Sequence, residues 1–499
     1  TLLVNYGHYL TMCMDRIFAV LVLGMLHQAA AHAEDRAAGG EAILFQDIPA
    51  VYGASKYEQK LSEAPAAVSI VTADEIGKYG YRTLADILRS VTGFYTSSDR
   101  AYTYAGARGF QRPGDYNGRI LLLIDGYRVN DNIFDQAFLG NESIVDVDTV
   151  DRVEVIRGPG SSLYGTNAFF ATINVITKRG RDLKGAEVTG EAGSFHSYKG
   201  RLAYGDKLEN GAEVLLAVSR YDSRGQSFFY PEFNDPATNN GIARGIDREQ
   251  YKNLFAKIAL HDLTLTAGYV ARDKVLPTAP FGTVFNDPGT RITDPQLGFV
   301  NLKYERDLAD ASRIMVRVGY SSYYYEGNYL YPAGLSRDQD YGRWWVTEAQ
   351  LTQTLNDRHK LVAGVEQQNN TRQDQNTFNY GTNTTQLAEH RNSIRRAIYV
   401  QDEYRVRDDL RLNAGARYDK YESFGGTLNP RLGLIYGATD NTTLKLLYGR
   451  AFRAPNVYEQ YYNDADATQK GNPNLKPETI DTYEFVAEHI HRSGLRGVI

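Results

Sequence analysis

The sequence predicts an all-β membrane protein, in which a small α+β domain precedes a large antiparallel transmembrane β-barrel. Three observations lead to this prediction. Apolar and polar side chains alternate in run after run from Ala186 to Gly449, the connections between runs are alternately short and long, and helix signals stop after Lys184. A strand with period-two alternation has one apolar and one polar face, as the wall of such a barrel requires.

Composition supports this class and argues against others. The chain has 499 residues, a net charge of -5 and a mean hydropathy of -0.44. The mild charge argues against a nucleic-acid partner, and the low mean hydropathy is uninformative because alternating strands hide their lipid face from an average. Tyrosine is abundant, with 37 residues, and its amphipathic ring suits a membrane–water interface. Ordinary β-propensity is the alternative explanation.

The first segment, residues 1–33, is interpreted as upstream residues followed by a secretory signal peptide. Met14 is a plausible start, Arg16 supplies a positive charge, and Ile17 to Leu26 form an apolar run too short to span a bilayer. The small residues around His32 suit cleavage before Glu34. The single cysteine, Cys13, precedes that point and excludes a disulfide framework.

Three further segments follow. Residues 34–57 indicate an extended, mobile arm and linker. Residues 58–180 mix strand and helix signals, with Thr72 and Thr83 as helix N-caps and Glu75 completing a capping box. Residues 181–499 form the predicted barrel wall, with about fourteen strands. A small domain placed before such a barrel would plug it, and large plugged barrels have about 22 strands, so we interpret the chain as a C-terminally truncated barrel.

Solvation fixes which strand face meets lipid. In the run from Leu410 to Asp419, the charged residues Arg411 and Arg417 share one parity and Leu412 shares the other. Because a charge on the lipid face is costly, the arginines must face the lumen. Short turns are expected near Gly205–Gly211, Leu260–Asp262, Leu308–Ala311, Leu355–Arg358, Val406–Asp409 and Gly437–Asn441, and long loops near Arg224–Glu249, Lys274–Pro295, Glu326–Tyr341, Asn369–Arg395 and Ala451–Thr479.

Seven strings in order resemble the TonB-dependent outer-membrane receptors over the whole mature chain: "EAPAAVSIVTADEI", "LADILRSVTGFY", "ARGF", "RILLLIDGYRVND", "VDRVEVIRGPGSSLYGTNAFFATINVITK", "GRAFRAPNVYEQYY" and "GNPNLKPETIDTYEF". The resemblance implies that the first domain plugs the barrel. It also implies a monomer in the outer-membrane lipid of a Gram-negative bacterium that imports a scarce, bulky nutrient. An inner-membrane TonB-ExbB-ExbD complex would supply the energy by pulling on the plug.

The resemblance implies three sets of site residues. A TonB box would add as a strand to its partner, and its candidates are Ile43, Asp47, Ile48, Pro49, Ala50 and Val51, a plain linker being the alternative. Plug arginines would pair with acidic wall side chains that parity turns inward, namely Arg108, Arg157, Glu403 and Glu484, unless each arginine is satisfied within its own turn. The plug apex would bind the ligand through Arg100, Tyr102, Tyr104, Arg112 and Tyr116, by stacking and cation–π contact with planar or anionic groups, unless these residues only reflect ordinary loop composition.

A ferric siderophore is the favoured ligand, and cobalamin is the next. Haem receptors of this family carry a His between FRAP and NPNL, and none lies between Phe452 and Leu475 here. No resident cofactor or metal is expected, because no His cluster has ligand spacing. No reactive Ser/His/Asp set or carboxylate pair predicts an enzyme. A passive outer-membrane channel or porin is the other alternative, although a porin needs neither plug nor coupling arm.

Overall fold

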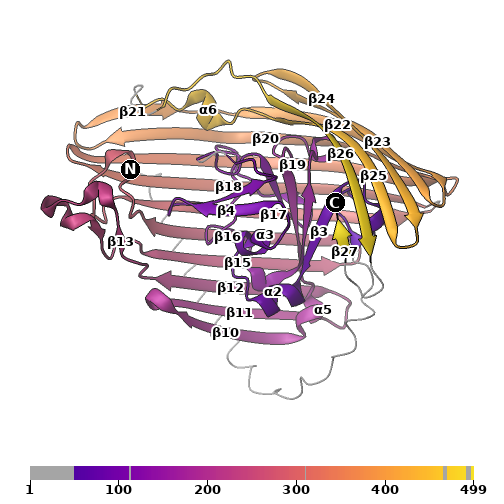
Figure 1. Ribbon diagram of the computed structural model, residues 1–499, viewed down its shortest axis with the longest axis horizontal. Coiled ribbons are helices and arrows are strands. Elements are labelled where there is room, and N and C mark those ends of the chain that lie inside the picture. Colours follow the sequence, from indigo (N-terminus) through magenta and orange to yellow (C-terminus); the bar gives the residue numbers. More distant parts are fainter. Residues whose placement is uncertain (1–49, 112–113, 310, 465–468, 491–495, 499) are drawn as a thin grey trace.

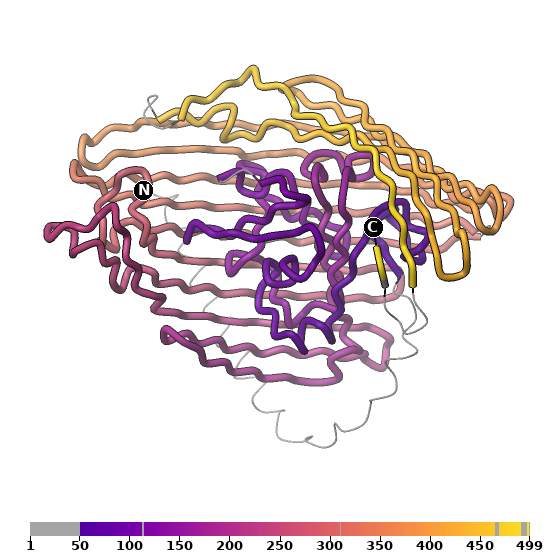
Figure 2. The backbone as a smooth tube through the Cα atoms, viewed as in Figure 1, coloured from indigo at the N-terminus to yellow at the C-terminus, as the bar shows by residue number. Residues whose placement is uncertain are grey.

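The computed structural model describes residues 50–111, 114–309, 311–464, 469–490 and 496–498. Two sheets dominate it, one of 16 strands and one of five. The larger sheet curves, and the smaller one lies against its concave face (Figure 1). The tube in Figure 2 shows the indigo N-terminal part enclosed by this curve. Within the described ranges, no helix is long and apolar enough to cross a membrane.

The N-terminal part is an α+β unit. Its five-stranded sheet has the order β3-β8-β9-β6-β7, in which only β6 and β9 run parallel. The elements are β1 (Ala50–Val51), β2 (Gln59–Lys60), η2 (Leu61–Glu63), β3 (Ala67–Thr72), α2 (Ala73–Tyr79), α3 (Leu84–Arg89), β4 (Phe94–Ser98), β5 (Thr103–Ala107), β6 (Ile120–Ile124), β7 (Tyr127–Arg128), η3 (Val147–Thr149), β8 (Val150–Arg157), α4 (Ser161–Tyr164), β9 (Ala171–Thr177) and α5 (Gly180–Leu183).

Both predicted helix starts are confirmed. Thr72 caps α2 and forms a capping box with Glu75, and Thr83 caps α3 with Asp86 in the equivalent role. In each case the hydroxyl accepts from a backbone N–H of the first turn that would otherwise lack a partner. Short polar signals therefore place these two helices without help from the rest of the fold.

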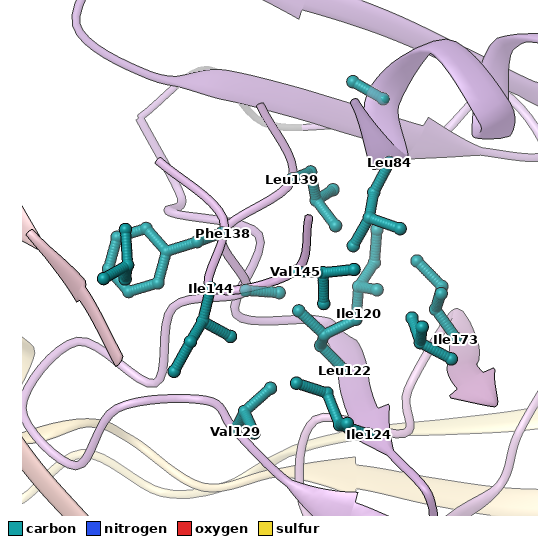
Figure 3. Close-up of a cluster of buried hydrophobic side chains, with 14 of the residues drawn as sticks. Leu84, Ile120, Leu122, Ile124, Val129, Phe138, Leu139, Ile144, Val145 and Ile173 are labelled. Atoms are coloured by element: carbon teal, nitrogen blue, oxygen red, sulfur yellow. The ribbon is translucent and has the colours of Figure 1, made fainter. Parts of the chain in front are cut away.

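A continuous apolar core holds the plug sheet and its helices together. Figure 3 shows β6 side chains, Leu122 among them, pointing toward Leu139 and Val145 of the following segment, with Ile173 of β9 alongside. All five residues of β6 are buried. Strands buried on both faces read as unbroken apolar runs, which explains the string "ILLLI".

We expect Leu122→Ala to destabilise the plug by about 3 kcal/mol, because it removes buried methyl groups and leaves a cavity. Leu122 is 1% exposed. Urea unfolding followed by plug-specific hydrogen exchange would measure the loss. The control is Leu208→Ala in an exposed turn, which should change stability by less than about 0.5 kcal/mol. Equal effects of the two substitutions would contradict the assignment of this core.

The large sheet is antiparallel throughout, and its strand order follows the chain from β10 to β27, with β21 paired to β20 at the side. Without the short β21 and β27 its 16 strands become the fourteen that were predicted. The strands are β10 (Gly185–Gly193), β11 (Ser197–Lys207), β12 (Glu213–Ser223), β15 (Glu249–Leu260), β16 (Leu263–Val275), β17 (Arg291–Leu308), β18 (Ser312–Tyr331), β19 (Gly334–Leu355), β20 (His359–Asn379), β21 (Thr384–Glu389), β22 (Ser393–Arg407), β23 (Leu410–Tyr421), β24 (Gly425–Thr439), β25 (Thr442–Arg453), β26 (Glu478–Ile490) and β27 (Arg496–Val498).

Smaller elements lie between these strands at the long-loop rim. They are η4 (Ser194–His196), β13 (Phe228–Phe229), η5 (Pro231–Phe233), η6 (Pro236–Gly241), β14 (Ile242–Ala243), η7 (Pro280–Gly282) and α6 (Val457–Tyr461). In Figure 1 this rim is on the left, where β13 and β21 lie.

The predicted parity of the wall is confirmed. On β23, Arg417 is 2% exposed beneath the plug, whereas Leu412 and Tyr418 are 39% and 44% exposed on the outer face. Glu484 likewise points inward between the exposed rings of Tyr483 and Phe485. Because side chains alternate strictly along a strand, one fixed charge determines the orientation of its whole strand.

All six short turns are confirmed, but two of the long loops are wrong. The segments Glu326–Tyr341 and Asn369–Arg395 continue as paired strands of β18 to β22. Outside the bilayer, polar cross-strand pairs replace apolar alternation: Gln339 donates to Glu326 at 3.0 Å, and the rings of Tyr324 and Tyr341 are 4.9 Å apart. Such pairs stabilise strands without leaving a period-two hydrophobic signal.

Candidate functional site

The segment between β1 and β2 is fastened to the wall by a buried ion pair. The Lys56 ammonium contacts the Glu348 carboxylate of β19, and the Tyr399 hydroxyl of β22 donates to the same carboxylate at 2.8 Å. The ammonium also lies 4.2 Å from the centre of the Tyr399 ring. Burial lowers the pKa of Lys56, and the neighbouring Glu348 opposes that shift. At this buried place an unpaired charge would be costly, and the contact lets the two groups compensate each other.

Further wall side chains contact this segment and the residues just after β2. Arg431 of β24 donates to the carbonyl of Ala54 at 3.0 Å and to that of Pro65, and Arg411 of β23 pairs with Glu63 at 2.8 Å. The prediction of a mobile arm up to residue 57 is therefore wrong for its last part, since residues 53–57 are all buried. In the sequence these small and polar residues look like a linker. Their burial cannot be seen there, because the side chains that bury them belong to strands far away in the chain.

Two of the four residues predicted to connect plug and wall pair with each other, and the other two have different partners. Arg108 forms two hydrogen bonds of 2.7 Å with Glu484 of β26. Arg157 instead donates to the carbonyl of Thr92 within the plug at 2.9 Å, and Glu403 accepts from the Tyr57 hydroxyl at 2.7 Å. The geometry thus brings Arg108 and Glu484 together and places Arg157 and Glu403 in other contacts. Their role as a releasable lock stays a prediction.

A second plug–wall connection includes the FRAP arginine. Arg453 at the end of β25 bonds to Glu478 at 2.6 Å and to Glu459 of α6 at 2.9 Å. Arg119 of the plug forms a bidentate pair with the same Glu478 at 2.7 and 2.9 Å. This four-residue network joins the plug, the wall and the loop after β25, and parity alone did not single it out.

We expect Arg108→Ala to weaken the docking of the plug against the wall by no more than about 1 kcal/mol, because the Arg108 side chain is 37% exposed and water screens the ion pair. Arg119→Ala should cost roughly 2 kcal/mol, since that side chain is 12% exposed and bridges two carboxylates. Denaturant-dependent proteolysis of the plug would compare them. A larger loss in Arg108→Ala would contradict this ranking.

The predicted apex residues make contacts within the fold, and their role in ligand binding stays a prediction. The Tyr102 hydroxyl donates to Asp294 of β17 at 2.5 Å, and that of Tyr104 donates to Asp99 at 2.8 Å. Burial raises the pKa of both phenols, so they remain protonated donors. Tyr116 packs among other rings, and Arg100 lies 4.1 Å from the ring centre of Phe228 in the loop after β12. Arg112 lies outside the described residues.

The loop after β25 contacts the plug through hydrogen bonds and ring packing. The backbone N–H of Val457 donates to the carbonyl of Ile133 at 3.0 Å, and the Asn456 side chain donates to that of Phe134 at 2.8 Å. The Tyr458 ring packs 5.0 Å from that of Phe134. A ligand bound beside this loop would therefore touch both the outer loops and the plug.

Two polar cavities of about 250 Å³ each lie between plug and wall at the long-loop rim. In the first, Arg272 and Lys274 are already paired with Glu249 and Asp247, and Arg100 lies at its edge. The second presents amide, hydroxyl and guanidinium groups from the plug, from β20, β22 and β23 and from the loop after β25, beside the carboxyl groups of Asp135 and Glu422; it is lined among others by Asn132, Gln373, Arg391, Arg395, Gln460 and Tyr461. Such groups suit an oxygen-rich ligand.

In the second cavity Arg395 donates to Gln368 at 2.5 Å, and the Arg391 guanidinium stacks 3.5 Å from the ring centre of Tyr461. Each cavity is smaller than a typical pocket for a drug-sized ligand, so a bulky ligand would place only part of itself there. Among the residues that the structure describes, no group of three or more His, Cys, Asp or Glu is placed to hold a metal ion.

Comparisons with known proteins agree with this architecture. Residues 60–172 match the family described as TonB-dependent Receptor Plug Domain, and residues 269–496 match TonB dependent receptor-like, beta-barrel. An iron-regulated outer membrane virulence protein of Vibrio cholerae is 25% identical over 95% of this chain and 70% of its own length. A vitamin B12 transporter of Vibrio vulnificus is 24% identical over 87% of this chain and 66% of its own length.

Solved structures show the same fold. The outer-membrane ferripyoverdine receptor of Pseudomonas aeruginosa, bound to ferripyoverdine, has a TM-score of 0.67 at 17% identity, covering 89% of this chain and 64% of that one. A ferric enterobactin receptor from Pseudomonas aeruginosa has a TM-score of 0.64 at 18% identity, covering 85% and 69%. The chain thus spans 64% to 70% of the length of these four proteins. With a plug and a receptor wall in their family order, the chain belongs to the TonB-dependent receptors of the Gram-negative outer membrane, a family of receptors and transporters.

Proposed function

We propose that the protein binds a ferric siderophore at its outer face and imports it actively. The observation that carries this proposal is the second cavity, where plug, wall and outer loop together present amide, hydroxyl and guanidinium groups. Hydroxamate, catecholate and carboxylate oxygens of an iron chelate accept hydrogen bonds from such groups. Similarity to an iron-regulated outer-membrane protein and to two ferric siderophore receptors supports the same substrate class.

Energy would come from a TonB-ExbB-ExbD complex that pulls on the segment before the plug. The residues from Ile43 to Val51 are the proposed coupling segment, of which Ile43 to Pro49 lie outside the described ranges. Ala50 and Val51 form β1, which pairs with Gln59 and Lys60 of β2. A pull on this segment would soon reach the wall contacts of Ala54 and Lys56, since both residues follow β1 by only a few positions.

Cobalamin is the second candidate ligand, because several relatives at 24% to 26% identity are vitamin B12 transporters. The two ligands differ chemically. A ferric siderophore surrounds its metal with oxygen ligands, whereas the corrin carries neutral amide groups. Loss of a guanidinium from the cavity should therefore weaken the binding of an anionic chelate far more than the binding of cobalamin.

Binding and uptake together test the proposal. The full chain in detergent would be titrated with ferric siderophores of different chelating groups, cobalamin and haem, following quenching of intrinsic fluorescence. We expect saturable binding of one ferric chelate, weakened about tenfold by Arg395→Ala through the loss of a charged hydrogen bond. Arg450→Ala, at an exposed pair with Asp481 on the outer face, is the control. Selective binding of cobalamin would favour the second candidate.

Uptake of radiolabelled iron by cells separates import from passive entry. Ile48→Pro removes a backbone N–H that strand addition would need. It should abolish uptake and leave binding unchanged. Uptake that persists in Ile48→Pro, or in cells whose proton gradient is collapsed, would instead indicate a passive channel.

A further inference from the structure

The outer face of the wall carries a shallow apolar hollow of about 750 Å³ across β18 to β24. Two adjacent cross-strand rows line it. One row runs from Leu351 through Ala363 and Val400 to Ala416, and the next runs from Ala349 through Val365 and Ile398 to Tyr418. The alanines leave space because their methyl groups lie between larger, exposed apolar side chains.

A pair of like charges lies directly above the hollow. The next cross-strand row toward the long-loop rim holds Gln367, Arg396 and Lys420, in which Arg396 and Lys420 are directly opposite each other and exposed. Like charges at such a position repel each other. Arg396 donates to the Gln367 side chain at 3.0 Å, and in the part of the chain that the structure describes neither cation forms an ion pair with a carboxylate.

An exposed aromatic residue marks the level of this row. Trp345 lies one row further toward the long-loop rim, pairs with Asn369 and packs against Tyr320 at 4.9 Å between ring centres. Trp and Tyr gather where a bilayer meets water. The order of the surface from that rim downward is therefore indole, paired cations, then apolar hollow, as at a lipid headgroup and its acyl chain.

We propose that this face binds a phosphorylated, acylated lipid of the outer leaflet, with an acyl chain in the hollow and the phosphate between Arg396 and Lys420. The apolar surface faces the bilayer by the parity established above, so acyl chains are its available occupants. A phosphate would cancel the repulsion of the two cations and accept charged hydrogen bonds from both. This site is independent of the nutrient pathway, since it lies on the opposite face of the wall from the plug.

The two tryptophans allow a local test. Trp344 is 1% exposed and Trp345 is 46% exposed on the outer face. The full chain in neutral micelles would receive brominated phosphatidic acid or brominated phosphatidylcholine at equal mole fraction, and Trp345→Phe would define the background. We expect phosphatidic acid to quench preferentially, with relative association raised roughly fivefold per basic residue at the site.

Variants separate the phosphate contact from the acyl contact. Arg396→Gln combined with Lys420→Gln should abolish the preference, whereas Arg450→Gln, an outer-face arginine already paired with Asp481, should retain it. Ala363→Leu partly fills the hollow and should lower the association of phosphatidic acid with both cations intact. Circular dichroism verifies that each variant keeps its strands.

The proposal is overturned if both lipids quench wild-type protein equally, or if the preference survives in the double Gln variant. It is also overturned if inorganic phosphate displaces the brominated phosphatidic acid at millimolar concentration, because the cations would then bind a free anion without its acyl chain. If phosphatidic acid associates equally with Ala363→Leu and with wild type, the hollow is not part of the binding site.

Discussion

Lys56→Met is expected to lower the stability of plug docking against the wall by about 3 kcal/mol, one of the two largest effects expected at the plug–wall interface. Methionine keeps most of the side-chain volume but leaves the Glu348 carboxylate buried, with the Tyr399 hydroxyl and the Arg317 guanidinium at 3.8 Å as its remaining partners. Native-state hydrogen exchange over residues 50–66 should show roughly a hundredfold faster exchange through opening.

The double variant Lys56→Met with Glu348→Gln should recover part of the loss, because it removes the uncompensated Glu348 charge; recovery is incomplete because the buried Arg317 then loses its carboxylate partner. The matched control is Lys78→Met, which removes an exposed ion pair with Asp74 at 2.7 Å and should leave exchange unchanged. If Lys56→Met exchanges like wild type, the buried pair does not hold the segment. Other contacts would then oppose a pull on the coupling arm.

Gly165→Ala should destabilise the plug–wall interface by about 2 to 4 kcal/mol, through backbone strain together with a clash. Gly165 has φ 73° and ψ -141°, a region that is nearly exclusive to glycine. A Cβ there would lie 2.9 Å from Asp419 Oδ1 and 3.1 Å from Arg417 Nε. These two side chains form a buried pair of 2.9 Å that has little room to move.

Gly109→Ala separates the two causes. Gly109 has φ 85°, but an added Cβ would meet nothing within 4 Å, so the substitution reports backbone strain alone, about 1 kcal/mol. Urea unfolding of both variants measures the difference. Equal losses would mean that the Arg417–Asp419 pair moves aside without cost.

Much of this architecture could be predicted from the sequence, because solvation acts on each strand separately. A charged residue such as Arg417 orients β23 whatever its neighbours do, and Thr72 caps α2 through contacts with the next few residues. Such rules fail above the membrane, where both faces of a strand meet water. That is why the paired extensions around Tyr331 and Asn379 were expected as loops.

The sequence by itself determined the two-part organisation, the parity of the wall and the family, since these depend on local periodicity and on strings of adjacent residues. Only the tertiary structure decided which lumen residue meets which plug residue. Lys56 and Glu348 are separated by 292 positions, and parity places Glu348 inside without naming its partner. The partner depends on how the plug docks within the curved wall, which the summed packing of many contacts fixes and no short segment encodes.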